Sequence, residues 1–176
     1  MLKMLSVALL ALGLASCSQV GGGEYFPLEE GKQWDYQLNF VMPDGKNKKE
    51  LTIRTVGSSS FKTEEDEIQG MVRRTSDGTD YLVQEREDGF YRVGKRVIVQ
   101  TKPQADKAPR LILPKGRNLR VGYTWTMDTS PYVAHWMPPF IEANASIKPF
   151  DMVYEIASLD DTVETPAGVF QKCVRV

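Results

Sequence analysis

The sequence predicts an all-β fold, either a single curved antiparallel sheet or an open barrel built as a meander. Apolar residues recur at every second position near the start of the domain, at Trp34, Tyr36, Leu38, Phe40 and Met42. Such alternation places one set of side chains on one face of a strand. Turn sequences containing Asp-Gly, at 43–45, 77–78 and 88–89, separate the β-rich runs and are typical of tight hairpins.

Expected strands follow one another along most of the chain. They are 34–42, a strand restarting at Leu51 and Ile53, 68–75, 80–86, 90–100, 111–113, 119–127, 150–158 and 169–176. No stretch has the period of a long amphipathic helix, and short helical turns are expected at most near 104–109 and 138–146. The pattern therefore favours a meander over any mixed α/β arrangement.

The alternation also predicts where the core lies. Trp34, Tyr36, Leu38 and Phe40 are expected to point to one buried face, and Trp125 is expected to join them. Cys173 lies in an apolar run and is interpreted as a buried small hydrophobe.

The N-terminus carries the most specific motif. Lys3 is followed by an uncharged apolar run over 4–14, which has the length of a secretory signal and is too short to cross a bilayer. It ends in Leu14-Ala15-Ser16-Cys17, which resembles the lipobox of bacterial lipoproteins. The resemblance implies that residues 1–16 are a signal peptide and that Cys17 carries a diacylglyceryl group and an N-acyl chain. No other cofactor is expected.

The lipobox resemblance also implies a location and a domain organisation. Because Ser18 follows the cysteine, the expected site is the periplasmic face of the outer membrane. Residues 17–23, which include three glycines, are expected to be the lipidated cysteine and a flexible tether, and 24–176 a single β domain. With Cys17 lipidated, Cys173 has no partner for a disulfide within the chain.

Three further motifs resemble a family of uncharacterised bacterial lipoproteins whose domain has no known function. They are Tyr25-Phe26-Pro27-Leu28 leading to Trp34-Asp35-Tyr36, Leu119-Arg120-Val121-Gly122-Tyr123-Thr124-Trp125, and Thr165-Pro166-Ala167-Gly168-Val169-Phe170 with Cys173. Such proteins continue past the cysteine strand into a further hairpin. The resemblance therefore implies a copy shortened at its C-terminus, with strand 169–176 lacking a partner on one edge.

Composition and motifs argue against several function classes. With 22 basic and 23 acidic residues, the chain has no electrostatic footprint for nucleic acid. Clusters at Lys46-Lys48-Lys49 and at 64–67 are interpreted as solvated hairpin tips. His135 is the only histidine and no G-x-S-x-G motif is present, so an enzyme, and a hydrolase in particular, is the minority hypothesis.

No metal site is expected, because neither His135 nor Cys173 has ligand spacing around it. The acidic run of Asp160, Asp161 and Glu164 fits an acidic loop better than a calcium site.

The segment 129–141 has no charged residue and is rich in proline and in large apolar side chains, among them Tyr132, Trp136, Met137 and Phe140. It is either a contact surface for a lipid, a peptide or a protein, or a loop packed over the open end of the sheet.

The sequence favours a non-catalytic binding or scaffold domain on the membrane. The alternative is a half-barrel that carries or chaperones an apolar ligand, such as a lipid or a lipoprotein.

Overall fold

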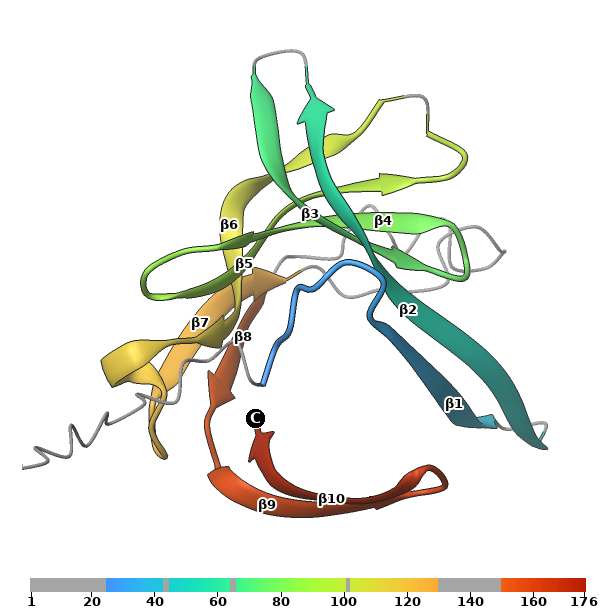
Figure 1. Ribbon diagram of the computed structural model, residues 1–176, viewed down its shortest axis with the longest axis vertical. Coiled ribbons are helices and arrows are strands. Elements are labelled where there is room, and N and C mark those ends of the chain that lie inside the picture. The colour runs from blue at the N-terminus through green and yellow to red at the C-terminus, as the bar shows by residue number, and fades with distance from the viewer. Residues whose placement is uncertain (1–24, 43–44, 64–65, 101, 130–149) are drawn as a thin grey trace, which may run out of the picture.

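The computed structural model (Figure 1) contains ten strands and one short 3-10 helix, Gly116–Asn118, within the residues that it describes, 25–42, 45–63, 66–100, 102–129 and 150–176. The strands are β1 (Gln33–Met42), β2 (Gly45–Lys62), β3 (Glu67–Thr75), β4 (Thr79–Glu85), β5 (Gly89–Val97), β6 (Gln104–Pro114), β7 (Thr124–Thr129), β8 (Phe150–Glu155), β9 (Ser158–Thr165) and β10 (Gly168–Arg175).

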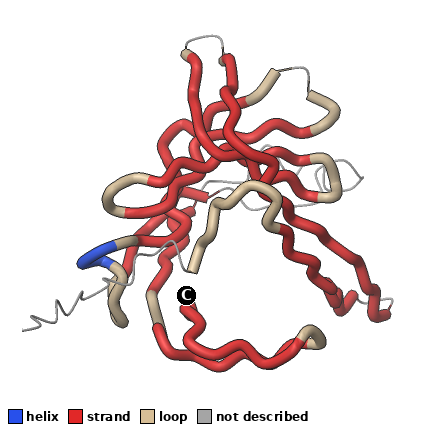
Figure 2. Tube along the Cα trace, viewed as in Figure 1, coloured by secondary structure: helices blue, strands red, loops and turns tan. Residues whose placement is uncertain are grey.

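Strands β1 to β6 form one antiparallel sheet in sequence order, so each strand pairs with the next one along the chain. The sheet curls into a half-barrel, which confirms the predicted curved meander (Figure 1). Two hairpins, β7–β8 and β9–β10, follow it. Figure 2 shows how fully strands account for the described chain.

The curvature has local causes in the sequence. Register shifts interrupt the ladders between Thr55 and Gly57 and between Leu82 and Val83, and such bulges increase the twist of a strand. Gly57 has a φ of 129°, a conformation that side chains rarely adopt. At Gly70, a Cβ atom would lie 2.6 Å from the carbonyl oxygen of Val83, so only glycine permits this approach of β3 to β4.

The best-packed region belongs to the six-stranded sheet. Its cluster of buried residues comes from four successive strands and consists of Phe61, Val72, Leu82 and Val93, with Ile68 and Tyr91 packed against it. Phe90 is 1% exposed, and the ring of Phe26 lies 5.1 Å from its ring. The segment before β1 thus covers part of the sheet.

Trp125 of β7 and Arg110 of β6 join the β7–β8 hairpin to the large sheet, and Arg110 donates hydrogen bonds to the carbonyl of Asp128 at 2.9 Å and to the hydroxyl of Thr129 at 2.8 Å. Trp125 is 9% exposed, stacks on Tyr154 at 5.4 Å, and donates a hydrogen bond from Nε1 to the carbonyl of Leu111 in β6. Ile156, just after β8, is fully buried and exchanges backbone hydrogen bonds with Gly122 and Tyr123. The β9–β10 hairpin begins beyond this point and curves away below the sheet (Figure 1).

Several expected boundaries were wrong. Residues 104–109 belong to β6 and are not a helical turn, because Gln104 and Ala105 pair with β5; 138–146 lies outside the described residues. The strand expected over 119–127 begins only at Thr124, since Gly122 turns the chain with a φ of 77°. The strand expected over 150–158 ends at Glu155, and β9 was not expected at all.

The prediction that the apolar face of β1 is buried was also wrong. Tyr36 is 45% exposed, and Trp34 and Leu38 are half-buried; the side chain of Phe40 lies outside the described residues. The reason is that alternation defines an apolar face but does not supply a layer to cover it, and among the described residues little packs on this face of the edge strand β1. Trp125 is buried, as predicted. Its indole ring packs against the rings of Tyr123 and Tyr154, not against the aromatic residues of β1.

Candidate binding surfaces

The site residues predicted from the sequence lie outside the described residues. These are the lipidation residue Cys17 and the apolar loop residues Tyr132, Trp136, Met137 and Phe140. No described helix is long and apolar enough to cross a membrane.

The acidic run is placed by the structure in a strand, not in a loop. Asp161 pairs with Arg175 of β10, with 3.3 Å between Oδ2 and Nε. Asp160 and Glu164 are exposed residues of the same strand. Across the described part of the chain, no group of three or more His, Cys, Asp or Glu side chains is arranged to hold a metal ion.

Cys173, expected to be buried, is half-buried and is a free thiol. Its Sγ lies 3.6 Å from the carbonyl oxygen of Phe170. Lys172, one residue before it, has a φ of 56°, at a register shift of the β9–β10 ladder. The bulge, and the lack of a layer packed over this hairpin among the described residues, explain why the thiol is not enclosed there.

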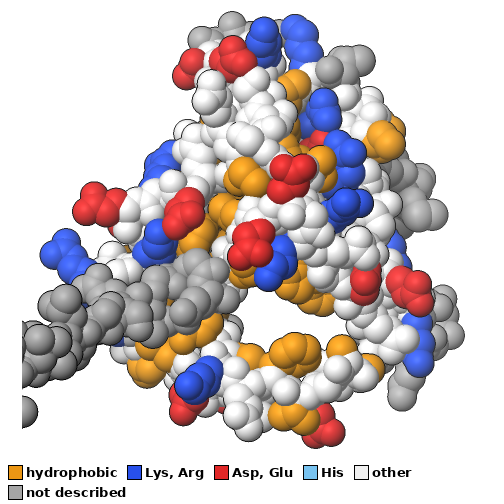
Figure 3. Space-filling view, in the orientation of Figure 1, with side chains coloured by type: hydrophobic (Ala, Val, Ile, Leu, Met, Phe, Trp, Pro, Cys, Tyr) orange, Lys and Arg blue, Asp and Glu red, His pale blue; other side chains and the backbone are white. Residues whose placement is uncertain are grey.

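An opening passes through the molecule between the β9–β10 hairpin and the rest of the domain. Figure 3 shows it as a gap in the space-filling surface, with hydrophobic side chains gathered along the hairpin where it borders the gap. Val163 and Phe170 lie opposite each other in the register and are 42% and 50% exposed; Val169 is 62% exposed. No residue of β9 or β10 is buried.

The β1–β2 hairpin lies across this opening from β9–β10 in Figure 1. Register places Trp34 opposite Ile53 and Tyr36 opposite Leu51, so these four apolar side chains share one face of the hairpin. All four are half-buried or exposed. Exposed apolar surface on two facing hairpins is uncommon in a monomer and is typical of surfaces that bind something.

Arg73 packs over the inner end of this apolar face. Its guanidinium carbon lies 3.9 Å from the ring centre of Phe26 and 4.5 Å from that of Trp34, and Nη2 donates to the carbonyl of Pro27 at 2.9 Å. Burial lowers the pKa of Arg73, since no carboxylate among the described residues pairs with it and its Nε has no partner. The two rings hold this cation in place.

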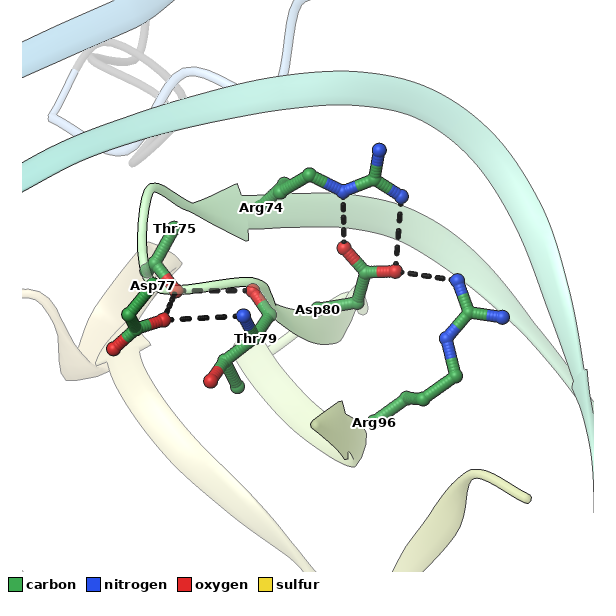
Figure 4. A network of polar contacts seen from close by, with 6 residues as sticks. All are labelled: Arg74, Thr75, Asp77, Thr79, Asp80 and Arg96. Carbon is green, nitrogen blue, oxygen red and sulfur yellow. Dashed lines mark hydrogen bonds and ion pairs between the residues drawn. The ribbon is translucent and has the colours of Figure 1, made fainter. Parts of the chain in front are cut away.

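On a different part of the sheet, a row of charged side chains crosses four strands. Register places Arg54 (β2) opposite Arg74 (β3), Arg74 opposite Asp80 (β4), and Asp80 opposite Arg96 (β5). Figure 4 shows Arg74 and Arg96 converging on the Asp80 carboxylate. Arg74 donates from Nε at 2.6 Å and from Nη2 at 3.0 Å, and Arg96 donates from Nη2 at 2.6 Å.

Asp80 is 3% exposed, yet it is charged. Burial alone raises the pKa of this carboxyl, but the hydrogen bonds and charges of Arg74 and Arg96 outweigh burial and lower the pKa. The adjoining turn is fixed by Asp77, which accepts hydrogen bonds from the hydroxyl of Thr75 and the N–H of Thr79 (Figure 4).

Sequence reasoning missed this row, although a signal for it exists. The Asp77-Gly78 turn lies midway between Arg74 and Asp80, so a hairpin centred there places the two side chains opposite each other. The position of Arg96 depends on the register shift between Leu82 and Val83, which no sequence pattern shows.

Comparisons with known proteins identify no relative: no family model, curated protein or solved structure matches the chain.

Proposed function

We propose that this protein is a lipid-anchored binding domain of the bacterial cell envelope, without catalytic activity, which holds an acyl chain at the open side of its half-barrel. One observation carries the proposal: the β9–β10 hairpin borders an opening with exposed apolar side chains, including Val163 and Phe170. Burying such surface against an acyl chain is favourable, at about 25 cal/mol per Å² of apolar area removed from water.

The expected tether supports a lipid as the occupant. Seven residues, 17–23, separate the start of the mature chain from the domain. Fully extended, they span at most about 25 Å. A domain anchored through Cys17 therefore stays beside the membrane surface, where acyl chains are the most abundant apolar molecules.

A photoreactive, alkyne-tagged palmitate supplied to cells that make the full chain tests the anchor and the binding surface together. An adduct at Cys17 that forms without light reports lipidation, and Cys17→Ser is expected to remove it. An adduct that forms only on illumination, in peptides from β1–β2 or β9–β10, reports the bound chain. Illumination without any such adduct would contradict acyl-chain binding while leaving the anchor result intact.

A matched pair of variants locates the contact. Phe170→Asp places a charge on the apolar face of β10, and light-dependent labelling is expected to fall strongly. Thr162→Asp adds the same charge at an exposed position beside Val163, on the opposite face of β9, and labelling is expected to persist. Equal labelling in both variants would exclude the β9–β10 hairpin as the binding surface.

A scaffold function is the second candidate, and a separate observation favours it. Within the described residues, β9 and β10 pair only with each other, so each presents an outer edge of N–H and C=O groups. An extended segment of another protein can add to such an edge as a further strand. In-cell crosslinking through a photoreactive residue at position 170, on the same face as Val163, would capture a protein in this case and a lipid in the first.

A further inference from the structure

The charged row across the sheet has more positive charge than its own partners neutralise. It contains the guanidinium groups of Arg54, Arg74 and Arg96 and the single carboxylate of Asp80. The side chain of Arg54 makes no ion pair or hydrogen bond with any other residue in the described ranges. It nevertheless lies directly opposite Arg74, and like charges in this relation destabilise a sheet.

Asp80 fixes the direction of two of these groups. Its buried carboxylate takes three hydrogen bonds from Arg74 and Arg96, so both guanidinium groups have one edge anchored. Their side chains remain 51% and 45% exposed, and their remaining N–H groups are free to donate outward. Anchoring in this way reduces the entropy that each side chain loses on binding an anion.

The groups line a groove. Arg54, Arg74, Gln33, Thr52 and Ser76 line a space of about 770 Å³, and Arg74 also borders a neighbouring space of about 350 Å³ that reaches Arg96. The Ser76 hydroxyl accepts a hydrogen bond from the N–H of Thr52 at 3.1 Å, which leaves its own proton available to donate.

Acidic groups near the groove leave the arginines available. Glu30 also lines the larger space, but its carboxylate lies against Gly57 and forms no ion pair with Arg54. The Asp35 carboxylate accepts hydrogen bonds from the neutral groups of Gln33 at 3.1 Å and of the Thr52 hydroxyl at 2.7 Å, and it forms no ion pair with an arginine of the groove. Three arginines against the two carboxylates of Asp80 and Glu30 leave one positive charge in the lining.

We propose that this groove is an anion site that binds a phosphate group through Arg54, Arg74 and Arg96. Guanidinium groups pair with phosphate oxygens through charge-assisted hydrogen bonds, and a tetrahedral anion offers acceptors to several donors that approach from different directions. The phosphate comes from one of two sources, the headgroup of a membrane phospholipid or a phosphate free in solution. This inference does not depend on acyl-chain binding at the opening.

The test uses the full chain in a neutral detergent. Binding is measured by calorimetry at constant ionic strength, with inorganic phosphate as the free anion and glycerophosphoglycerol as a headgroup without chains. Sodium chloride and sodium acetate serve as comparison anions. Saturable binding of either phosphate probe is expected, with a higher melting temperature in its presence.

Arg54→Gln is the decisive variant, because Arg54 supports no contact of the described fold. The variant is expected to melt at the same temperature as the parent or slightly above it, since a like-charge pair is removed. Its affinity for the phosphate probe is expected to fall roughly tenfold. Arg117→Gln removes another exposed arginine, in the 3-10 helix, and is expected to bind as the parent does.

Each outcome decides a point. Binding of glycerophosphoglycerol alone identifies a lipid headgroup, and binding of inorganic phosphate alone identifies a free anion; both support the site. Acetate that binds as tightly as phosphate overturns the assignment to phosphate. Affinity that is unchanged in Arg54→Gln, or the absence of saturable binding for both probes, overturns the site itself.

Discussion

The curled sheet and the β9–β10 hairpin are built from the same kind of strand but are stabilised very differently. In the sheet, Leu82 and Phe90 are 0% and 1% exposed, while in the hairpin Val169 and Phe170 are 62% and 50% exposed. Both regions are held by backbone ladders, although register shifts interrupt the pairing of β4 with β5 and of β9 with β10. Backbone pairing therefore forms the strands in both regions, but only in the sheet does burial of side chains contribute much to stability.

The contrast also separates structural positions from binding positions. The buried residues of the sheet are surrounded by protein and contribute to stability. Apolar residues of the hairpin have no protein layer over them among the described residues, so their apolar character contributes little to the stability of this fold. Substitutions that affect the two regions differently are the way to test this division.

The largest effect is expected at Phe90. Phe90→Ala removes a buried ring packed on Phe26, and the free energy of unfolding is expected to fall by about 3–5 kcal/mol. Phe170→Ala makes the same chemical change in β10 and is expected to cost less than about 0.5 kcal/mol. Urea unfolding followed by tryptophan fluorescence measures both. Similar losses would show that the hairpin is packed after all.

Asp80→Asn is expected to lower the free energy of unfolding by about 2 kcal/mol near pH 7. The amide has nearly the shape of the carboxylate, but it removes the negative charge between two arginines and places an N–H group against their donors. Arg117→Gln, at an exposed arginine, serves as the control and is expected to be neutral. A neutral Asp80→Asn would mean that the ion pairs contribute no net stability.

The ion pairs of Asp80 also predict how the stability difference between the parent and Asp80→Asn depends on pH. The folded protein lowers the pKa of Asp80, so its contribution is complete above the unfolded-state pKa of about 3.9. The contribution is lost as the pH falls below that value, through the lower folded-state pKa. The difference in stability between the parent and Asp80→Asn is thus expected to be constant near neutral pH and to shrink below about pH 4. A difference that grows on acidification would mean that folding raises the pKa of Asp80 instead of lowering it.

Trp34 and Trp125 sharpen the comparison at intermediate burial. Trp34 is half-buried beneath Arg73, and Trp34→Ala is expected to cost about 1–2 kcal/mol. Trp125 is buried on Tyr154 and donates to Leu111, and Trp125→Ala is expected to cost about 3–5 kcal/mol. Thermal unfolding followed by circular dichroism ranks them. A larger loss of stability in Trp34→Ala than in Trp125→Ala would support the buried β1 face that the sequence alone predicted.

How far the sequence predicts this molecule depends on whether a feature is local. The Asp77-Gly78 and Asp88-Gly89 turns predict the β3–β4 and β4–β5 hairpins because both residues of each turn are neighbours in the chain. The strand β9 was missed because its acidic residues have low β-propensity, and it is formed by pairing with β10 across the turn between Thr165 and Gly168.

Features set by tertiary packing were not predictable in this way. Alternation in β1 identifies an apolar face, but it does not show whether another layer covers that face, and Tyr36 is exposed. The anion site needs the registers of three strand pairs at once, since Arg54 and Arg96 are far apart in sequence. A register shift of one residue would have moved Arg96 to the other face.

The smallest effect on stability, and a clear effect on association, is expected at the outer edge of β10. Among the described strands β10 pairs only with β9, and exposed apolar residues near a free edge favour pairing with another chain. The unlipidated domain, residues 24–176, is therefore expected to self-associate as its concentration rises. Val169→Lys places a charge in this strand and is expected to shift the domain to monomer, while changing the free energy of unfolding by less than about 0.5 kcal/mol.

Val99→Lys is the control. It removes a similar apolar side chain, 85% exposed, from the turn after β5 and is expected to leave association unchanged. Size-exclusion chromatography with light scattering at several concentrations distinguishes an edge effect from a general loss of surface hydrophobicity. A parent domain that stays monomeric throughout would mean that the edge of β10 is already covered, and strand addition would then have to be abandoned as the basis of the scaffold candidate.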